Sequence, residues 1–310
     1  MAVYLVLMPI FEADFHPRSY GFRPGRGARQ AVEEIQEALR KGKTEVVDAD
    51  LAQYFDTIPH RKLIRQVARR VSDGMILKLI KAWLRAPIVE EEEGGGRKMK
   101  SNICGTPQGG VISPLLANIY LHPLDEGVND QCQQKPRMIR YADDLVILCR
   151  PGEGQGLKER LNRWLQSRGL TLNETKTRVI QSRECGFEFL GFSFRWQQSK
   201  WGTPYVRTEP SPAAEQALRD RVRELTRRPT TWRETGKVVR EINQVTRGWG
   251  NYFALGHYHR SFGQMNRFIA HRLRQWLWRK HGNPTGKYKR WPDRVLVQTH
   301  GLYQMPKPMV

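Results

Sequence analysis

Two adjacent carboxylates, Asp143 and Asp144, are the side chains of this 310-residue chain whose types and spacing most clearly indicate chemistry. They lie between two short β-forming runs, residues 138–142 and 145–149, so the pattern predicts a tight hairpin with Asp-Asp at its tip. Two like charges in a turn gain nothing unless positive charge lies against them, and a divalent cation is the natural candidate. The alternative is a solvated acidic turn, and the pair alone does not decide between the two.

A second acidic site is predicted at the end of a buried strand within residues 44–51. Asp48 and Asp50 would point to the same face of that strand, because side chains alternate with a period of two. Carboxylates from a strand end and a hairpin could together bind two divalent ions, an arrangement that supports in-line phosphoryl transfer. Taken alone, Asp50 would more often be an ordinary turn residue.

The charge of the chain indicates a polyanionic partner. The net charge is +21 and the pI is about 10.2. Residues 201–310 hold 21 Lys+Arg against 7 Asp+Glu, a net of +14, and six of the nine tryptophans. A basic, aromatic-rich segment of this size fits nucleic acid better than a membrane. Because no apolar run approaches about 18 residues, we expect no transmembrane helix and no membrane partner.

The cysteines and the first residues favour an intracellular, cytoplasmic protein. Residues 1–11 are apolar but lack a basic leader and a small-residue cleavage site, so a buried helix is expected there rather than a signal peptide. The cysteines form no close pair, which argues against a disulfide framework and a zinc site. They are Cys104, Cys132, Cys149 and Cys185.

The periodicity of the chain predicts an α+β fold in two domains, residues 1–200 and 201–310, joined by a Pro-marked linker at 203–212. The first domain would combine helices with strands and hairpins, and the second would be helical and basic. The expected helices are 31–40, 56–70, 111–121, 157–169 and 262–281, and the expected strands or hairpins are 44–51, 88–99 and 187–196.

In chain order, several segments resemble the motifs of reverse transcriptases encoded by group II introns. The segment 141–144 reads Tyr-Ala-Asp-Asp, the palm motif of that family, and so many blocks in the correct order make chance matching very unlikely. The palm-like segments are 50–56, 105–110, 141–144, 170–177 and 189–192, the fingers-like segments are 19–26 and 111–120, and the segment 247–253 resembles the maturase (X) thumb.

The resemblance implies a right-hand polymerase palm with partial fingers, an antiparallel sheet plus helices, followed by an α-helical thumb or maturase (X) domain. The implied activity is RNA-directed DNA synthesis, in which dNTPs extend a DNA primer on an RNA template by two-metal nucleotidyl transfer. Binding and splicing of a group II intron RNA would accompany it. The alternatives are a non-catalytic RNA-binding splicing factor and the same fold used in defence or repair.

The resemblance also implies roles for individual residues of the palm. Asp50, Asp143 and Asp144 would be the catalytic carboxylates that bind two Mg²⁺ ions, for which Mn²⁺ can substitute. Lys176 would lie near the leaving pyrophosphate, where a cation stabilises or protonates it. Phe55 would clash with a 2′-hydroxyl and so select deoxynucleotides, although a plain core Phe is the alternative.

Further implied roles concern the substrates. Gln108 and Gly109 would line the nucleotide and template pocket, and Arg23 and Arg26 would lie near the triphosphate or the template. The implied primer grip comprises Phe189, Leu190 and Gly191. Core packing explains the aromatic residues of the segment 189–192 equally well. The implied RNA-binding residues, for which a solvated basic face is the alternative, are Arg219, Arg223, Arg267 and Arg274.

The match departs from the family pattern at both ends. Family members usually begin with additional fingers blocks before the segment that corresponds to residues 1–11. We therefore expect an N-terminally truncated form of the family. No Cys-rich or His-rich nuclease segment follows the thumb, so no DNA endonuclease activity is expected of this chain.

Overall fold

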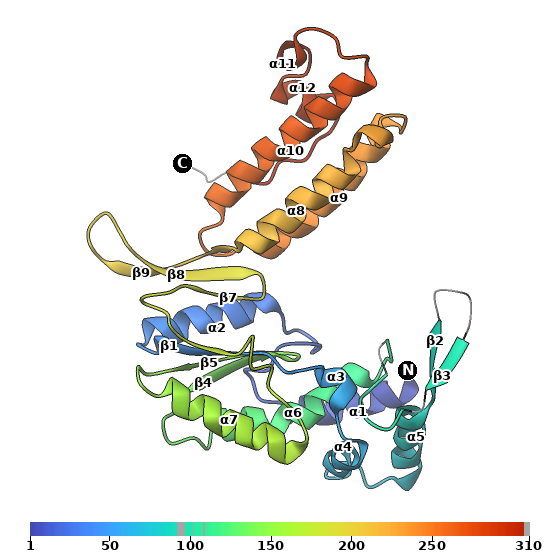
Figure 1. Cartoon of the computed structure of the whole chain (residues 1–310), viewed down its shortest axis with the longest axis vertical. Coiled ribbons are helices and arrows are strands. Elements are labelled where there is room, and N and C mark those ends of the chain that lie inside the picture. The colour runs from blue at the N-terminus through green and yellow to red at the C-terminus, as the bar shows by residue number, and fades with distance from the viewer. Residues whose placement is uncertain (92–96, 101, 108, 307–310) are drawn as a thin grey trace. The chain divides into compact units, whose positions relative to one another are not determined.

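The computed structural model describes residues 1–91, 97–100, 102–107 and 109–306, which form two compact units, Met1–Cys185 and Gly186–Val310 (Figure 1). The first unit ends earlier than the boundary expected near residue 200, because three strands after it associate with the C-terminal helices. The tip of the hairpin expected at 88–99 lies outside the described residues, as does Gln108.

The first unit alternates helices with short strands. Its helices are α1 (Ala2–Glu12), α2 (Ala28–Arg40), α3 (Tyr54–Thr57), α4 (His60–Val67), α5 (Gly74–Arg85), α6 (Ser113–Asn129) and α7 (Gly154–Arg168). Its strands are β1 (Glu45–Ala49), β2 (Ile88–Glu91), β3 (Arg97–Lys100), β4 (Arg137–Tyr141), β5 (Asp144–Cys149) and β6 (Arg178–Gln181).

A four-stranded antiparallel sheet in the order β4-β5-β1-β6 forms the centre of the first unit. Val47 pairs with Ile147, and both are fully buried in the core that α6 and α7 complete. Helix α2 covers the other face of the sheet (Figure 1). Because side chains alternate along a strand, Asp48 and Asp50 emerge on the face opposite to Val47. Val47 and Ala49 lie in the core and Asp48 between them does not, which confirms the alternation within β1.

The acidic hairpin exists, but the prediction of its tip is wrong by one residue. Tyr141 pairs with Asp144, so the two turn residues are Ala142 and Asp143, and Asp144 is the first residue of β5. Ala142 has a φ of 59°, which is strained for a residue with a Cβ. The sequence pattern predicts Ala142 to be a strand residue, because alanine gives no local signal for a positive φ.

The helix expected over 56–70, with its start around Pro59, is α4, which begins at His60, and a separate short helix, α3, precedes it. Ile58 lies between them with a ψ of 117°, outside the helical region. The residue before a proline is pushed out of the α region by the proline ring, and Pro59 follows directly. The chain therefore turns between the two helices, which leaves Tyr54 and Phe55 on a separate short segment.

The second unit consists of an antiparallel meander and a bundle of helices (Figure 1). The segment expected as a linker at 203–212 is instead a strand that ends in a helix cap, where the side chain of Ser211 accepts a hydrogen bond from the backbone of Ala214. The elements are β7 (Phe187–Phe189), β8 (Phe192–Gln198), β9 (Pro204–Pro210), α8 (Pro212–Leu225), the 3₁₀ turn Arg228–Thr230, α9 (Thr235–Phe253), α10 (His259–Lys280), α11 (Lys287–Arg290) and α12 (Asp293–Gln298).

Helix α10 confirms the long helix expected over 262–281. Its predicted apolar face is buried against α8 and α9. The buried residues of that face are Phe262, Met265, Ile269, Leu273, Trp276 and Leu277. Among the described residues, no helix is both long and apolar enough to cross a membrane.

Two leucines on helices of the first unit test where its core lies. Leu161 of α7 is 3% exposed, whereas Leu79 of α5 is 44% exposed. Leu161→Ala should lower the free energy of unfolding by about 2–5 kcal/mol, because it removes buried methyl groups and leaves a cavity. Leu79→Ala should change it by no more than about 0.5 kcal/mol. Urea unfolding of both variants measures the difference, and equal losses would contradict this core.

Candidate active site

The register of the central sheet brings the acidic residues together. Asp48 pairs with Val146 and Ala49 with Leu145, so the next step along the antiparallel strands places Asp50 beside Asp144. Asp143 occupies the turn immediately before Asp144. Asp48, Asp50 and Asp143 are half-buried, and Asp144 remains open to solvent. The carboxylates predicted from two separate segments therefore form one acidic cluster.

Burial and the closeness of other carboxylates both disfavour the charged form of the carboxyl groups in this acidic cluster. Partial desolvation, and after it the carboxylates of Asp143, Asp50 and Asp48, raise the pKa of Asp144 to about 6. Burial likewise raises the pKa of Asp48, although Arg178 lies 3.4 Å from its carboxylate and opposes the shift. The cluster thus has more negative charge than its surroundings neutralise.

Residues of the segment that precedes β6 form hydrogen bonds and an ion pair with Asp50. The backbone N–H of Asn173 donates to the carbonyl of Asp50 at 2.8 Å, and the Asn173 side-chain amide donates to its carboxylate at 3.0 Å. Lys176 lies 3.4 Å from the same carboxylate. The structure thus brings Lys176 to the cluster, as expected. Asn173 had no assigned role, since its contact with Asp50 spans 123 positions and no local pattern reveals it.

The donor set fits hard divalent cations. Within the described residues, no three His, Cys, Asp or Glu side chains are already arranged tightly enough to hold a metal ion. The acidic cluster nevertheless consists of carboxylate oxygens alone, the ligands that Mg²⁺ and Mn²⁺ prefer over Zn²⁺. A bound cation would offset the negative charge that these neighbouring carboxylates bring together.

The Phe55 segment and the 105–110 loop are fastened to each other. The backbone N–H of Thr106 donates to the Phe55 carbonyl at 2.6 Å, and that of Gly105 donates to the Ile58 carbonyl at 2.8 Å. Phe55 is partly buried, and its ring meets the exposed ring of Phe22 edge-on at 6.3 Å. Gly109 is exposed at a φ of 78° with nothing near its missing Cβ.

Arg23, expected near the triphosphate or the template, has a guanidinium that is occupied by contacts within the first unit. Its side chain is buried and forms an ion pair with Glu12 at 2.8 Å. Its guanidinium also donates to the carbonyls of His16 and Ser19. Arg26 is only half-buried, with one hydrogen bond from its guanidinium to the Pro17 carbonyl, so it remains accessible to a phosphate.

Leu190 and Gly191 form the two-residue turn between β7 and β8, both with positive φ. Such turns match the twist of a hairpin. Tyr252 of α9 donates a hydrogen bond to the Leu190 carbonyl at 3.0 Å, and the ring of Phe253 lies 3.2 Å from where a Cβ of Gly191 would be. Phe189 is buried beside the turn, as the core-packing alternative predicts.

The basic residues of the second unit divide into exposed and structural ones. Arg267 is exposed on α10, and Arg223 is exposed on α8 beside Asp220. Arg219 is partly exposed and pairs with Glu215 at 2.9 Å. Arg274 was expected to bind RNA, but its side chain is 4% exposed and bonded to the Trp291 carbonyl and to Asp293.

Residues 1–194 match the family described as "Reverse transcriptase (RNA-dependent DNA polymerase)". The chain belongs to the reverse transcriptase family. Residues 215–294 match the "Group II intron, maturase-specific domain", so the resemblance to group II intron-encoded members of that family is confirmed. The Tyr-Ala-Asp-Asp turn, the Asp50 strand and the 105–110 loop all lie within the reverse transcriptase match.

Two relatives give the extent of the similarity along the chain. It is 33% identical to Protein YkfC of Escherichia coli (strain K12), over 65% of this chain and 61% of that protein. It is 25% identical to the group II intron-encoded protein LtrA of Lactococcus lactis subsp. cremoris, over 86% of this chain and 57% of that protein. The chain therefore spans less than two thirds of the length of either relative.

A solved structure confirms the fold class. The apo telomerase of Candida tropicalis superimposes with a TM-score of 0.53 at 13% identity, over 93% of this chain and 54% of that one. At this identity the likeness concerns the fold alone. The α+β polymerase fold predicted from the sequence is thus confirmed for this reverse transcriptase family chain.

Two glycines of the 105–110 loop test how tightly this reverse transcriptase family chain holds it. A Cβ on Gly105 would lie 2.7 Å from the backbone of Asp56, whereas one on Gly109 would meet nothing within 4 Å; both residues have positive φ. Gly109→Ala should cost about 1–2 kcal/mol of backbone strain. Gly105→Ala should have the same strain and, in addition, lose roughly 1–3 kcal/mol through overpacking against Asp56. Equal unfolding free energies would show that the loop is not packed on α3.

Proposed function

We propose that this chain is an RNA-directed DNA polymerase that extends a DNA primer on an RNA template with dNTPs. The observation that supports it most is the acidic cluster, in which Asp50 from one strand joins Asp143 and Asp144 from a hairpin. Polymerisation transfers a nucleotidyl group through a transition state of high negative charge. Carboxylates that hold cations beside the reacting phosphate are what that chemistry needs.

In this proposal Asp50 and Asp143 hold two Mg²⁺ ions, or Mn²⁺, and Asp144 completes the acidic cluster. Bound ions of this kind activate the attacking oxygen and stabilise the leaving oxygen of an in-line displacement. The chain contributes orientation: Asn173 fixes one carboxylate oxygen of Asp50, and the β4–β5 turn fixes Asp143. Lys176, beside Asp50 and solvent-exposed, neutralises charge on the leaving pyrophosphate.

The substrate-binding roles follow the exposure of each side chain. Phe55 is proposed to exclude a 2′-hydroxyl from the sugar site, with Phe22 against its ring edge. Gln108 and Gly109 are proposed to line the nucleotide and template pocket, and Arg26 to contact phosphate or template. Arg23, whose guanidinium is committed to Glu12 and to carbonyls, is proposed to shape the segment rather than to touch the substrate.

The second unit is proposed to act as the thumb, with the 189–191 turn as primer grip and the basic helices as RNA-binding surface. Arg219, Arg223 and Arg267 are its proposed phosphate contacts. The match of residues 215–294 to the maturase-specific domain supports a second, RNA-binding role on group II intron RNA. Splicing would then depend on this surface and not on the acidic cluster.

Asp143→Asn tests the polymerase directly. The variant should lose primer extension on an RNA template with Mg²⁺ by on the order of 10²–10³-fold, as when one group that stabilises transition-state charge is removed. Single-turnover extension of a labelled primer measures it. Asp130→Asn is the matched control, because Asp130 is exposed at the end of α6 and outside the acidic cluster.

Equal extension by wild type and Asp143→Asn would refute the role of Asp143. Intron splicing that survives Asp143→Asn while extension is lost would separate the two proposed roles. Splicing without any extension by the wild-type chain would favour the non-catalytic maturase.

Binding of RNA should depend steeply on salt, since each phosphate contact releases counterions. The logarithm of the affinity for a single-stranded RNA should fall linearly with the logarithm of the salt concentration, by about 0.7 per contact. Arg267→Gln should reduce that slope by about one contact, whereas Arg69→Gln, an exposed arginine of the first unit, should not. Filter binding at several salt concentrations measures both, and identical slopes would remove Arg267 from the interface.

A further inference from the structure

A fully buried arginine lies two residues before the catalytic turn. Arg140 of β4 is 0% exposed, and its guanidinium forms a two-point ion pair with Asp125 of α6, at 2.8 Å from Nε and 2.5 Å from Nη2. Asp125 itself is 1% exposed. Arginine carries five N–H donors in a fixed fork, so two of them are committed to this carboxylate.

The other three donors of Arg140 tie three separate segments together. One Nη1 hydrogen goes to the Asn118 side-chain oxygen at 2.8 Å and the other to the Ala142 carbonyl at 2.9 Å. The remaining Nη2 hydrogen goes to the Ser19 hydroxyl at 2.7 Å. The guanidinium is therefore saturated, and one of its bonds holds the turn residue that immediately precedes Asp143.

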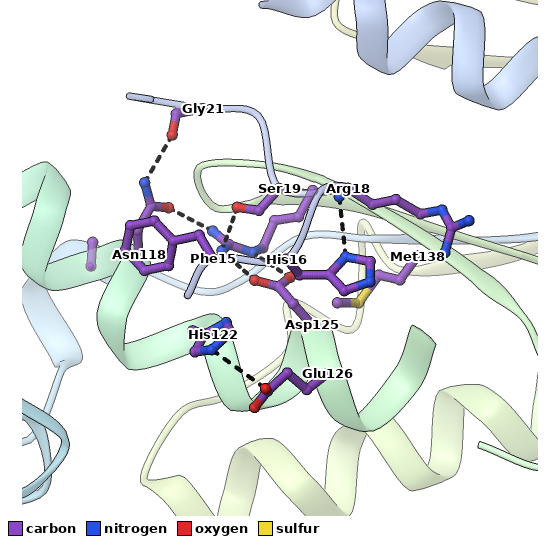
Figure 2. A network of polar contacts seen from close by, with 12 residues as sticks. Phe15, His16, Arg18, Ser19, Gly21, Asn118, His122, Asp125, Glu126 and Met138 are labelled. Atoms are coloured by element: carbon purple, nitrogen blue, oxygen red, sulfur yellow. Dashed lines mark hydrogen bonds and ion pairs between the residues drawn. The ribbon is translucent and has the colours of Figure 1, made fainter. Parts of the chain in front are cut away.

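The segment around Gly21 is fastened to the same turn. Asn118 also donates from its side-chain nitrogen to the Gly21 carbonyl at 2.8 Å, as Figure 2 shows. The backbone N–H of Tyr20 donates to the Arg140 carbonyl at 2.9 Å. A Cβ on Gly21 would lie only 2.3 Å from the Ala142 nitrogen, so the two backbones touch. The turn is thus clamped from two sides.

Stability alone is a weak reason for such an arrangement. A buried ion pair has a large desolvation penalty, and apolar residues of similar volume often serve the core as well or better. Backbone strain such as the positive φ of Ala142 persists only where the surroundings hold it, and it gathers at functional sites. Here the guanidinium bonds the carbonyl of the strained residue itself.

We propose that Arg140, fixed by Asp125 and Asn118, is a positioning residue that sets the conformation of the Ala142-Asp143 turn and thereby presents Asp143 to the catalytic cations. The inference rests on the proposed polymerase function for its catalytic consequence. Its structural consequence, a turn whose order depends on a buried ion pair, stands on the contacts alone.

Asp125→Asn tests the proposal, with two readouts that need no catalysis. Hydrogen exchange followed by mass spectrometry should show faster exchange in peptides covering residues 141–146 and 19–22, with α7 and α10 unchanged. Electron paramagnetic resonance of a Mn²⁺ titration should show binding weakened by about 10- to 100-fold, the usual effect of losing a group that orients a metal ligand. In primer extension, kcat should fall by on the order of 10²-fold with little change in the KM for dNTP.

Glu34→Gln is the matched control. It removes a carboxylate that pairs with Arg18 at 2.7 Å and with Arg137 of the same strand at 3.1 Å, away from the turn. Its Mn²⁺ affinity and kcat should equal those of the wild type. If Asp125→Asn does not fold, Asn118→Ala takes its place, since it leaves the ion pair intact and should still accelerate exchange at 19–22 and 141–146.

Wild-type Mn²⁺ affinity in Asp125→Asn, or wild-type exchange of the turn in Asn118→Ala, would overturn the proposal. So would exchange that rises evenly over the whole first unit, because that is the signature of general destabilisation. A wild-type chain that extends no primer would refute the proposed function only. The exchange and Mn²⁺ experiments would still decide whether Arg140 positions the turn.

Discussion

Repulsion among the carboxylates at the end of β1 and in the β4–β5 turn must be balanced for the central sheet to keep its register. The register itself is fixed by burial, since a slip of one residue would move Val47 and Ile147 out of the core and the acidic side chains into it. The fold therefore places the carboxylates close to one another, and other charged groups must offset their repulsion.

The nearby cations of the chain provide only part of that balance. Lys176 and Arg178 each lie 3.4 Å from a carboxylate of the acidic cluster, but both side chains are exposed, and exposed ion pairs contribute little. The charge of Arg140 is paired with Asp125. Burial alone would lower the pKa of this arginine, but the Asp125 carboxylate outweighs that effect and the pKa is raised. The remaining negative charge of the acidic cluster can bind divalent cations. The register of the sheet, which brings the carboxylates together, thereby supports the proposed chemistry.

The sequence could predict the parts of the site that local geometry determines. Alternation along β1 placed Asp48 and Asp50 on one face, and helical spacing identified the buried face of α10, because both depend on the period of a single element. The ordered motifs predicted the family and the polymerase fold. The predicted tip of the hairpin was off by one, since the positive φ of Ala142 is held by the buried side chain of Arg140 and by the close backbone of Gly21, and neither contact is visible in the local pattern.

What sequence reasoning missed depends on partners far along the chain. Arg23 and Arg274 looked like members of exposed basic motifs, yet each is buried against backbone carbonyls and one carboxylate from another segment. Asn173 and Asp125 were overlooked for the same reason, because their partners Asp50 and Arg140 lie on other elements. Periodicity reports which face of an element is apolar, but it does not report which polar side chain finds a buried partner.

In the proposed function, three residues of the acidic cluster, Asp50, Asp143 and Asp144, bind the divalent cations of a polymerase. Crystals of the chain with primer, RNA template and a non-reactive dNTP analogue, soaked in Mn²⁺, would test it by anomalous diffraction. We expect anomalous peaks bounded by Asp50 and Asp143, which disappear in Asp143→Asn crystals. Bound nucleic acid with Mn²⁺ peaks only elsewhere, or unchanged peaks in the variant, would contradict it.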